Sequence, residues 1–429
     1  MINVAVLGLG ARGGSVYCNF MANNKDLFNV VAICDVNSFK VNIFKDKFNL
    51  LDNMCFTNDE DFFSQGKLAD CLLICTQDED HYRHTKKAIE LGYHILLEKP
   101  ITPNENECIE LTNLARERNV KILVCHVLRY TAFYKEIKEI IDSGVLGQII
   151  SINQTENVAY WHQAHSFVRG AWRNKKESAP MILAKCCHDL DIMHWLVNSK
   201  CKSLSSVGKL NFFRKENAPI GSAKICLDCK EPKAGCPYDA EKIYLKNFLI
   251  QTEEERKNNW LVNVLTNFKP TKENLIESLR NGQYGRCVFE CDNDVVDYQN
   301  VTIEYENGVV GNLTMTAFSE HCFRETRVRG TLGEIISDDL SRIIKVNIYG
   351  KETYEIDINK IATDLSNHGG GDNKMMLELH DYLTLEGYSS KSLTTIAESL
   401  ESHLTALLAE EARITGKSYN LKEHFKIGG

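Results

Sequence analysis

The chain has 429 residues, enough for two domains, and its composition is ordinary for a globular protein. Its formal net charge is -8 at pH 7 and no basic stripe stands out, which argues against a nucleic-acid-binding protein. No run of about eighteen apolar residues occurs, so no membrane span is predicted. The sequence enters an apolar run at once, which leaves no room for a signal peptide.

The cysteine pattern bears on the cellular compartment. Of the sixteen cysteines, most stand singly inside apolar runs, as Cys34, Cys71, Cys75 and Cys125 do. A reduced thiol in such a run behaves as a small core residue. We therefore predict a protein of the reducing cytoplasm rather than a disulfide framework.

The first predicted elements are a buried strand at 4–7, a glycine-rich turn and a helix over 15–23. The turn carries G-x-G-x-x-G at Gly8, Gly10 and Gly13, with Ala11 and Arg12 inside it. In a dinucleotide site the first glycine permits the turn, the second lets the backbone approach a pyrophosphate, and the third lets the helix lie against the strand. The helix N-terminus then attracts the phosphates.

A second apolar run, 30–34, ends at Asp35. A carboxylate at this distance from the glycines can accept hydrogen bonds from an adenosine ribose and would repel a 2′-phosphate. NAD(H) is thus favoured over NADP(H), although an ordinary acid in a turn after a strand is the alternative interpretation of Asp35.

Helices and strands then alternate. Helices are predicted over 37–48, 59–64, 80–91 and 104–118, and strands over 70–75, 93–97 and 121–125. This alternation predicts a doubly wound parallel sheet, a Rossmann domain over residues 1–126. Ligands bind such sheets at the carboxyl ends of the strands. The glycine turn, Thr76, Gln77 and the Glu98-Lys99-Pro100 segment should therefore line one crevice.

Lys99 follows a predicted strand and precedes a proline. Its ammonium could stabilise the alkoxide that forms as a hydride leaves a substrate hydroxyl. A solvated surface lysine is the alternative.

Four stretches of this chain together resemble one known family, the Gfo/Idh/MocA oxidoreductases. They are G-L-G-A-R-G from Gly8, Asp35, T-Q-D-E-D-H-Y-R-H from Thr76 to His84, and E-K-P-I-T from Glu98 to Thr102. The resemblance implies NAD(H) as cofactor, His81 within the cofactor-binding segment, and Lys99 as a residue of the catalytic site. It also implies a C-terminal domain with a large open sheet that often forms oligomer contacts, and hence a homodimer or homotetramer.

The remainder, 127–429, is predicted as an α+β domain with a mainly antiparallel sheet. Residues 148–157 alternate as a half-buried strand does, and 301–316 forms a hairpin around Asn307-Gly308. Further strands are expected at 325–330, 333–337 and 343–349, with helices over 373–386 and 392–415.

A helical stretch from Lys185 to Trp195 carries the expected proton chemistry. His188 and Asp191 lie three residues apart, on one helix face. A histidine beside a nicotinamide can take the hydroxyl proton, whereas an isolated histidine is often a buried structural residue. The family pattern here is roughly D-x-G-x-H-x-x-D, and Ala184 stands in place of its first carboxylate. Lys185 could supply polar contact instead, and Asp191 is expected to orient or brace the helix rather than take part in the chemistry.

Other substrate contacts are expected outside this helix. Aromatic and polar residues suited to a carbohydrate interleave in the loop that carries Trp161, His162 and Arg173, and in the family this region often faces the sugar. His368 begins an H-G-G-x-D turn that in the family often lies near the active site. A packed surface loop is the alternative for each.

A long insertion at about 204–300 contains Cys226-x-x-Cys229, Cys236 and Cys287. A C-x-x-C pair has zinc-ligand spacing, and the other two thiols could complete a tetrahedral structural site. Cys291 could replace Cys287 in that site, and unligated reduced thiols or a redox pair are the alternatives.

The leading functional hypothesis is an NAD(H)-dependent oxidoreductase acting on a secondary hydroxyl of a sugar, sugar acid or cyclitol, with His188 and Lys99 as catalytic residues. A second hypothesis is glycoside cleavage through transient oxidation and elimination. A third is a non-catalytic NAD(H)-sensing protein, which the alanine at position 184 favours.

Overall fold

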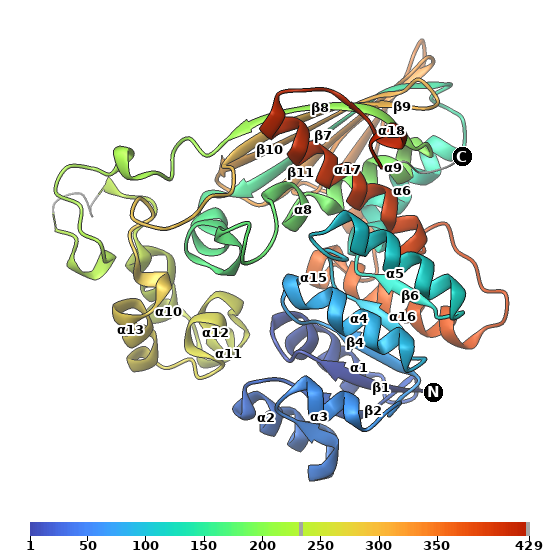
Figure 1. Cartoon of the computed structure of the whole chain (residues 1–429). Coiled ribbons are helices and arrows are strands. Elements are labelled where there is room, and N and C mark those ends of the chain that lie inside the picture. The colour runs from blue at the N-terminus through green and yellow to red at the C-terminus, as the bar shows by residue number, and fades with distance from the viewer. Residues whose placement is uncertain (231–234, 426–429) are drawn as a thin grey trace.

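The computed structural model describes residues 1–230 and 235–425. The predicted insertion and the predicted second domain are therefore described except at 231–234 and 426–429. Figure 1 shows two sheets with helices packed between and around them, and the C-terminal helix crossing from one sheet to the other.

The first sheet has six strands in the order β3-β2-β1-β4-β5-β6, and every pair in it is parallel. The order 3-2-1-4-5-6 is that of a dinucleotide-binding Rossmann domain, which confirms the predicted fold class. Its strands are β1 (Ile2–Leu7), β2 (Phe28–Cys34), β3 (Cys55–Phe56), β4 (Cys71–Ile74), β5 (His94–Leu97) and β6 (Ile122–Val124).

Helices join these strands as the alternating pattern predicted. They are η1 (Ala11–Cys18), α1 (Asn19–Asn23), α2 (Ser38–Phe48), α3 (Asp59–Ser64), α4 (His81–Glu90) and α5 (Glu105–Glu117). One difference lies directly after the glycine turn, where the predicted helix begins as a π-helix, η1.

The second sheet has nine strands in the order β14-β13-β12-β11-β7-β10-β9-β8-β15. Only β10 and β7 pair in parallel, so the prediction of a large, mainly antiparallel sheet is confirmed. The strands are β7 (Ile149–Ala159), β8 (Cys201–Lys209), β9 (Tyr298–Tyr305), β10 (Val310–Ser319), β11 (Phe323–Gly330), β12 (Gly333–Asp338), β13 (Ile343–Ile348), β14 (Tyr354–Asp357) and β15 (Tyr419–Asn420).

Helices pack on one face of this sheet, and a single apolar core lies between them and the strands. The helical segments of this half are η4 (Val127–Tyr130), α6 (Ala132–Asp142), α7 (Tyr160–His162), η5 (Gln163–Arg169), η6 (Ala171–Arg173), α8 (Met181–Ala184), α9 (Cys187–Val197), α14 (Ile358–Ile361), α15 (Ser366–Gly369), α16 (Gly371–Thr384), α17 (Ile396–Thr415) and α18 (Leu421–Phe425).

The C-terminal helices tie the two halves together. Met375, Met376 and Leu379 of α16 belong to the apolar core of the first sheet, although they follow the second sheet in sequence. Helix α17 packs on β8 and α9 and also on α5 and β6. The carboxyl edge of the first sheet is therefore held against α8 and α9, which positions the site described below.

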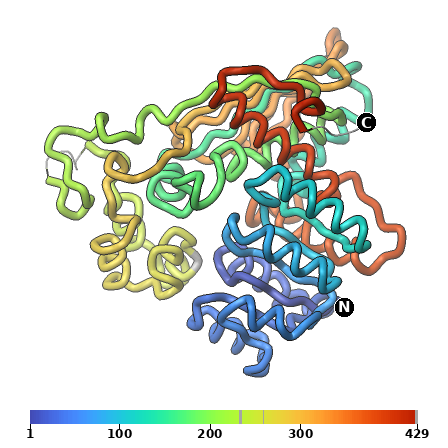
Figure 2. Tube along the Cα trace, viewed as in Figure 1, coloured from blue at the N-terminus to red at the C-terminus, as the bar shows by residue number. Residues whose placement is uncertain are grey.

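The insertion forms a small helical subdomain with its own apolar core. Its helical segments are η7 (Lys215–Asn217), η8 (Cys226–Asp228), η10 (Glu241–Lys246), α10 (Asn247–Ile250), α11 (Glu253–Asn258), α12 (Trp260–Thr266), α13 (Lys272–Asn281) and η11 (Gln283–Gly285). In Figure 2 its yellow coils stand apart from the nine-stranded sheet and approach the blue first domain. Contact is made there by the Lys269 ammonium, 4.2 Å from the ring centroid of Phe39 on α2.

Candidate active site

The glycine turn has the geometry that each glycine was predicted to provide. Gly8 has φ +96°, and a Cβ there would lie 2.4 Å from the Cys75 carbonyl oxygen. A Cβ on Gly13 would lie 2.0 Å from the Gly8 carbonyl oxygen, so the helix can approach the turn only without a side chain. A Cβ on Gly10 would meet no protein atom within 4 Å. The backbone at Gly10 is thus open to a ligand.

Asp35 ends β2 directly beside this turn. One carboxylate oxygen accepts a hydrogen bond from the Leu9 amide at 2.7 Å, and the other accepts one from the Asn37 amide at 2.8 Å. Lys40 lies 3.7 Å away. The carboxylate is fixed against the fingerprint loop, where the adenosine ribose of a bound dinucleotide is expected.

The side chain of Arg12 reaches across the turn to two carboxylates. Its guanidinium donates to Glu98 at 2.6 Å and to Asp372 of α16 at 2.5 Å. The Tyr17 hydroxyl also donates to Glu98. Although burial raises the pKa of Glu98, the positive charges of Arg12 and Lys99 outweigh this effect and hold it below its usual range. Sequence reasoning missed this network, which joins the glycine turn, β5 and α16.

Three predicted cofactor residues, Thr76, Gln77 and His81, follow β4 and differ in their exposure. Gln77 is exposed and Thr76 half-buried, so both have surface to offer a ligand. His81 is fully buried, with its two ring nitrogens 2.6 Å and 3.3 Å from the carbonyl oxygens of Pro100 and Thr76. Its imidazole has no surface to offer a cofactor and instead joins this loop to the segment that carries Lys99.

Lys99 projects from the end of β5 toward the second half of the chain. Its ammonium donates to the Ala184 carbonyl oxygen at 3.0 Å and lies 6.0 Å from the ring centroid of Trp172. Where the family pattern has a carboxylate, this chain offers a main-chain carbonyl to the lysine. No side-chain carboxylate pairs with Lys99 among the described residues, so its charge remains available to the crevice.

His188 lies in the first turn of α9, just after the segment that Lys99 contacts. Only 9% of its surface is exposed, and Nδ1 is buried without a hydrogen-bond partner. Burial lowers the pKa of His188 well below its usual value, and the charges of His126 and Lys99 lower it further. The imidazole is therefore neutral near pH 7 and able to accept a proton, and Lys99 is close enough to act on it electrostatically.

Asp191 is occupied by a partner that the sequence did not reveal. Arg129 of η4 binds both of its carboxylate oxygens at 2.7 Å, and both side chains are buried. The carboxylate has no exposed surface for a substrate contact, so this geometry favours the bracing role for Asp191. The pair fixes α9, and His188 with it, against η4.

Lys185 belongs to a buried cluster of charges under the same helix. Its ammonium lies 3.3 Å from Glu156 of β7, and Arg324 of β11 lies 2.5 Å from the same carboxylate. Arg324 also donates to Asp189 at 2.8 Å. Glu156 was not anticipated, because it is one alternating polar residue on a strand, and only the fold brings it beside Lys185.

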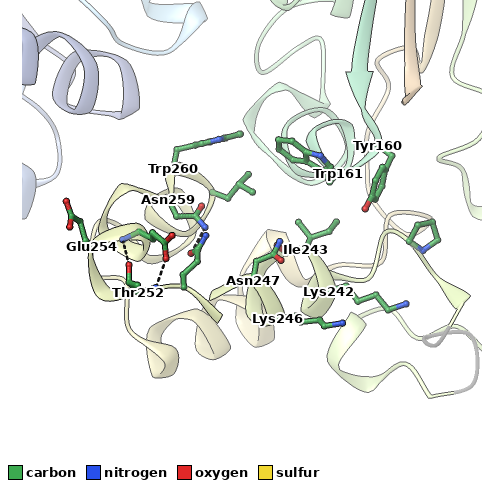
Figure 3. A pocket seen from close by; sticks show the side chains of 14 residues that line it. Tyr160, Trp161, Lys242, Ile243, Lys246, Asn247, Thr252, Glu254, Asn259 and Trp260 are labelled. Carbon is green, nitrogen blue, oxygen red and sulfur yellow. Dashed lines mark hydrogen bonds between the residues drawn. The ribbon is translucent and has the colours of Figure 1, made fainter. Parts of the chain in front are cut away.

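Trp161 follows β7 and borders a large hollow (Figure 3), and His162 lies next to it in the chain. The hollow has a volume of about 1060 Å³ and is walled on its other sides by the insertion. The His162 ring lies 5.7 Å from Trp161 and 5.6 Å from Trp260 of α12, centroid to centroid. The charges of Lys185 and Lys99 are among the influences that, after burial, lower the pKa of His162. His162 is therefore in ring contact with the aromatic wall of the hollow and within electrostatic range of Lys185 and Lys99.

The other two predicted substrate residues are paired. Arg173 binds Asp292 of the insertion at 2.9 Å and Glu177 at 2.9 Å, so its guanidinium is already used to hold the insertion in place. His368 has φ +49° and is 46% exposed, with its Nδ1 2.8 Å from Asp372. It is therefore partly open to solvent and lies next to the carboxylate that binds Arg12.

The predicted metal ligands Cys226, Cys229, Cys236 and Cys287 line one small cavity in the insertion. Their sulfurs are not drawn together as ligands. Within residues 1–230 and 235–425, no three histidine, cysteine, aspartate or glutamate side chains lie close enough together to hold a metal ion.

Comparison with known proteins identifies the family. Residues 2–126 match the model of the oxidoreductase family's NAD-binding Rossmann fold, and residues 138–421 match the model of its C-terminal alpha/beta domain. The chain belongs to the Gfo/Idh/MocA oxidoreductase family. It is therefore an oxidoreductase with an NAD-binding domain, as the glycine turn and Asp35 predicted.

Individual relatives are distant. The chain is 19% identical over 401 residues to the putative oxidoreductase YteT of Bacillus subtilis, an alignment that covers 88% of each protein. It is 25% identical over 205 residues to inositol 2-dehydrogenase of Salmonella paratyphi B, which covers 47% of this chain and 56% of that enzyme.

Among solved structures, an oxidoreductase of Agrobacterium radiobacter in complex with NAD+, L-tartaric acid and magnesium shares the fold, with a TM-score of 0.67. It is 14% identical, and the alignment covers 99% of each chain. Separately, none of the helices in the described part of the chain has the length and apolarity needed to cross a membrane.

Proposed function

We propose that this oxidoreductase uses NAD(H) to oxidise or form a secondary hydroxyl of a sugar, sugar acid or cyclitol in the cytoplasm. The observation that carries the proposal is the proximity of Lys99 and His188. The lysine is bound to the Ala184 carbonyl just ahead of the helix that holds the histidine, and its charge acts on the imidazole. The end of β5 and the start of α9 thus bring an ammonium group and a neutral imidazole close together.

The cofactor has a consistent place in this arrangement. Gly10 leaves the backbone open for a pyrophosphate, and Asp35 is held beside it for the ribose. When bound, NAD+ supplies the hydride acceptor. The protein's own groups then handle the proton: His188 takes it from the substrate hydroxyl, and the Lys99 ammonium stabilises the oxyanion that remains.

The proposed substrate class rests on the walls of the hollow beside the insertion. Trp161 and Trp260 present aromatic surface next to His162, and Figure 3 shows polar side chains such as Asn247 and Asn259 around the same hollow. Stacking surface combined with amide and hydroxyl groups suits a sugar ring, which is apolar on its faces and polar around its rim. The name of the relative inositol 2-dehydrogenase is in keeping with a polyol substrate.

The same hollow favours one alternative, the cleavage of a glycoside through transient oxidation. A volume of about 1060 Å³ exceeds the needs of one sugar and leaves room for an aglycone. In that reaction the sugar hydroxyl is oxidised, the neighbouring C–H proton is removed, the aglycone leaves by elimination, water adds, and the hydride returns. No net NADH accumulates.

The experiment is a turnover screen of free sugars, sugar acids, cyclitols and glycosides with NAD+, following NADH by absorbance and free aglycone by chromatography. Net NADH that disappears in a Lys99→Met variant supports the dehydrogenase. Aglycone release without NADH supports the alternative. Absence of both products, with NAD bound normally, would refute the proposed substrate class.

The insertion's share in substrate binding is testable in the same screen. Trp260→Ala should lower kcat/KM for a glycoside about tenfold, a loss of about 1.4 kcal/mol, and leave the parent sugar nearly unchanged. Ile250→Ala is the matched control, because Ile250 is an exposed apolar residue of the insertion that does not line the hollow.

We also propose that the enzyme assembles as a homodimer or homotetramer through the nine-stranded sheet. Its face opposite the helices exposes apolar side chains, among them Val207, Val310 and Ile336. Light scattering after gel filtration tests the assembly, and Val310→Lys should dissociate it, whereas a monomeric wild-type protein would refute it.

A further inference from the structure

Four cysteines of the insertion line one small cavity, although the last lies 61 positions after the first in sequence. Cys226, Cys229, Cys236 and Cys287 all line a cavity of about 20 Å³ between η8 and the segment after η11. This volume is about that of one water molecule. It therefore suits a single small ion and not a larger cluster.

Main-chain hydrogen bonds hold the segment of Cys226 against the segment of Cys287. Ile225 forms an isolated antiparallel bridge with Arg286, so the segments that carry Cys226 and Cys287 lie side by side. The Cys287 amide donates to the Lys224 carbonyl at 2.8 Å. The Cys229 amide donates to the Cys226 carbonyl at 3.2 Å, so the C-x-x-C segment is a tight turn with both thiols at its ends.

A buried charge beside the cavity points to an anion there. Arg169 of η5 has no exposed surface, and among the described residues its main electrostatic neighbours are Tyr244, Cys226 and Cys291, none of which is a carboxylate. Its guanidinium donates to the carbonyl oxygens of Arg286 and Tyr238 at 2.7 Å and approaches the Cys226 sulfur at 3.5 Å, while Nη1 has no partner. An uncompensated buried guanidinium is costly, so a counter-charge is needed.

We propose that Cys226, Cys229, Cys236 and Cys287 bind one zinc ion as thiolates. Four sulfur ligands are a typical structural zinc set, with Zn–S bonds of about 2.3 Å. One Zn²⁺ and four thiolates carry a net double negative charge, which Arg169 partly neutralises. Because the sulfurs stand around the cavity and not yet at ligand distance, binding draws them inward and releases their protons.

The expected role of the ion is to close the insertion on itself. The link from Cys226 to Cys287 encloses α10–α13, which carry Trp260 and most of the hollow's outer wall. Arg169 continues this link to η5, directly after Trp161 and His162. Zinc would therefore fix the wall of the hollow relative to the catalytic crevice without taking part in the reaction.

The test is metal analysis of the full-length protein purified without chelator or metal-affinity resin. We expect one zinc per chain by mass spectrometry of the elements, and release of that zinc by an organomercurial thiol reagent. Cys226→Ser and Cys287→Ser should lose the ion. Cys291→Ser is the matched control that should keep it, because Cys291 lies in the same insertion but does not line the cavity.

If the serine variants fail to fold, cobalt substitution of the wild-type protein provides an independent measurement of the site. A tetrahedral four-thiolate site gives Co²⁺ an intense sulfur-to-metal charge-transfer band, which zinc then abolishes. Three results would overturn the proposal: no bound zinc before or after incubation with zinc and a reductant, a Cys226–Cys229 disulfide as the resting state, or iron in place of zinc.

Discussion

Replacement of Gly10 by alanine should weaken NAD binding without weakening the fold. The backbone at Gly10 has φ -76° and ψ -158°, which alanine adopts readily, and the added methyl would meet no protein atom within 4 Å. The same open space is where the proposed pyrophosphate approaches the backbone. The methyl group therefore conflicts only with the ligand.

The added methyl group should stabilise the cofactor-free protein but weaken its binding of NADH. In the cofactor-free protein a compatible glycine-to-alanine change stabilises by about 0.4–1 kcal/mol, because the unfolded chain loses freedom. This corresponds to a rise in Tm of roughly 1–3 °C. In the complex, displaced phosphate oxygens lose one charge-assisted hydrogen bond from the backbone, worth about 1.5–3 kcal/mol. Kd for NADH should then rise about 10- to 150-fold.

The assay is a titration of cofactor-stripped protein with NADH, followed by calorimetry, paired with thermal unfolding of the same sample without cofactor. Gly13→Ala is the contrasting variant, because its Cβ would overlap the Gly8 carbonyl oxygen and should lower Tm in the absence of cofactor. An unchanged Kd for a well-folded Gly10→Ala protein would show that no phosphate lies against Gly10.

Three further outcomes test the catalytic crevice. Lys99→Ala should reduce kcat about 10²- to 10³-fold with little change in Tm, since its ammonium is held by one hydrogen bond to the Ala184 carbonyl and a distant contact with the Trp172 ring. Because the pKa of His188 is lowered, its imidazole stays neutral below pH 6.5, and kcat/KM should fall only at more acidic pH. In a His188→Asn variant this acidic fall in kcat/KM should disappear. Arg129→Ala should cost about 3–5 kcal/mol in unfolding measurements by leaving Asp191 unpaired, and Arg129→Met with Asp191→Leu should recover much of it.

The first domain could be predicted almost entirely from local patterns. Its strands are continuous apolar runs, because a parallel sheet is covered on both faces, and each helix has a recognisable start, such as Asn58 before α3 and Asn104 before α5. The glycine turn was also readable, since each glycine meets a steric demand within a few residues. The π-helical start of η1 was not, because no local pattern distinguishes it from an α-helix.

The candidate site was only partly predictable. Lys99 and His188 were found because each follows a recognisable element end, and the resemblance gave each a role. The partners of Asp191 and Lys185 were not found, since Arg129 lies 62 residues from Asp191 in sequence and Glu156 lies on a strand of the second sheet. Nothing in the alternation of β7 marks Glu156 as different from its polar neighbours.

For this protein, then, sequence by itself determined the parallel sheet, the glycine turn and the choice of Lys99 and His188 as catalytic candidates. These features depend on the spacing of buried residues, on the steric demands of a turn and on where strands end, which are all short-range constraints. Tertiary structure alone decided that Asp191 is held by Arg129, that a main-chain carbonyl receives Lys99 at Ala184, and that the insertion's cysteines surround one cavity. These depend on pairings between distant segments, whose free energy is gained only when the whole chain has packed.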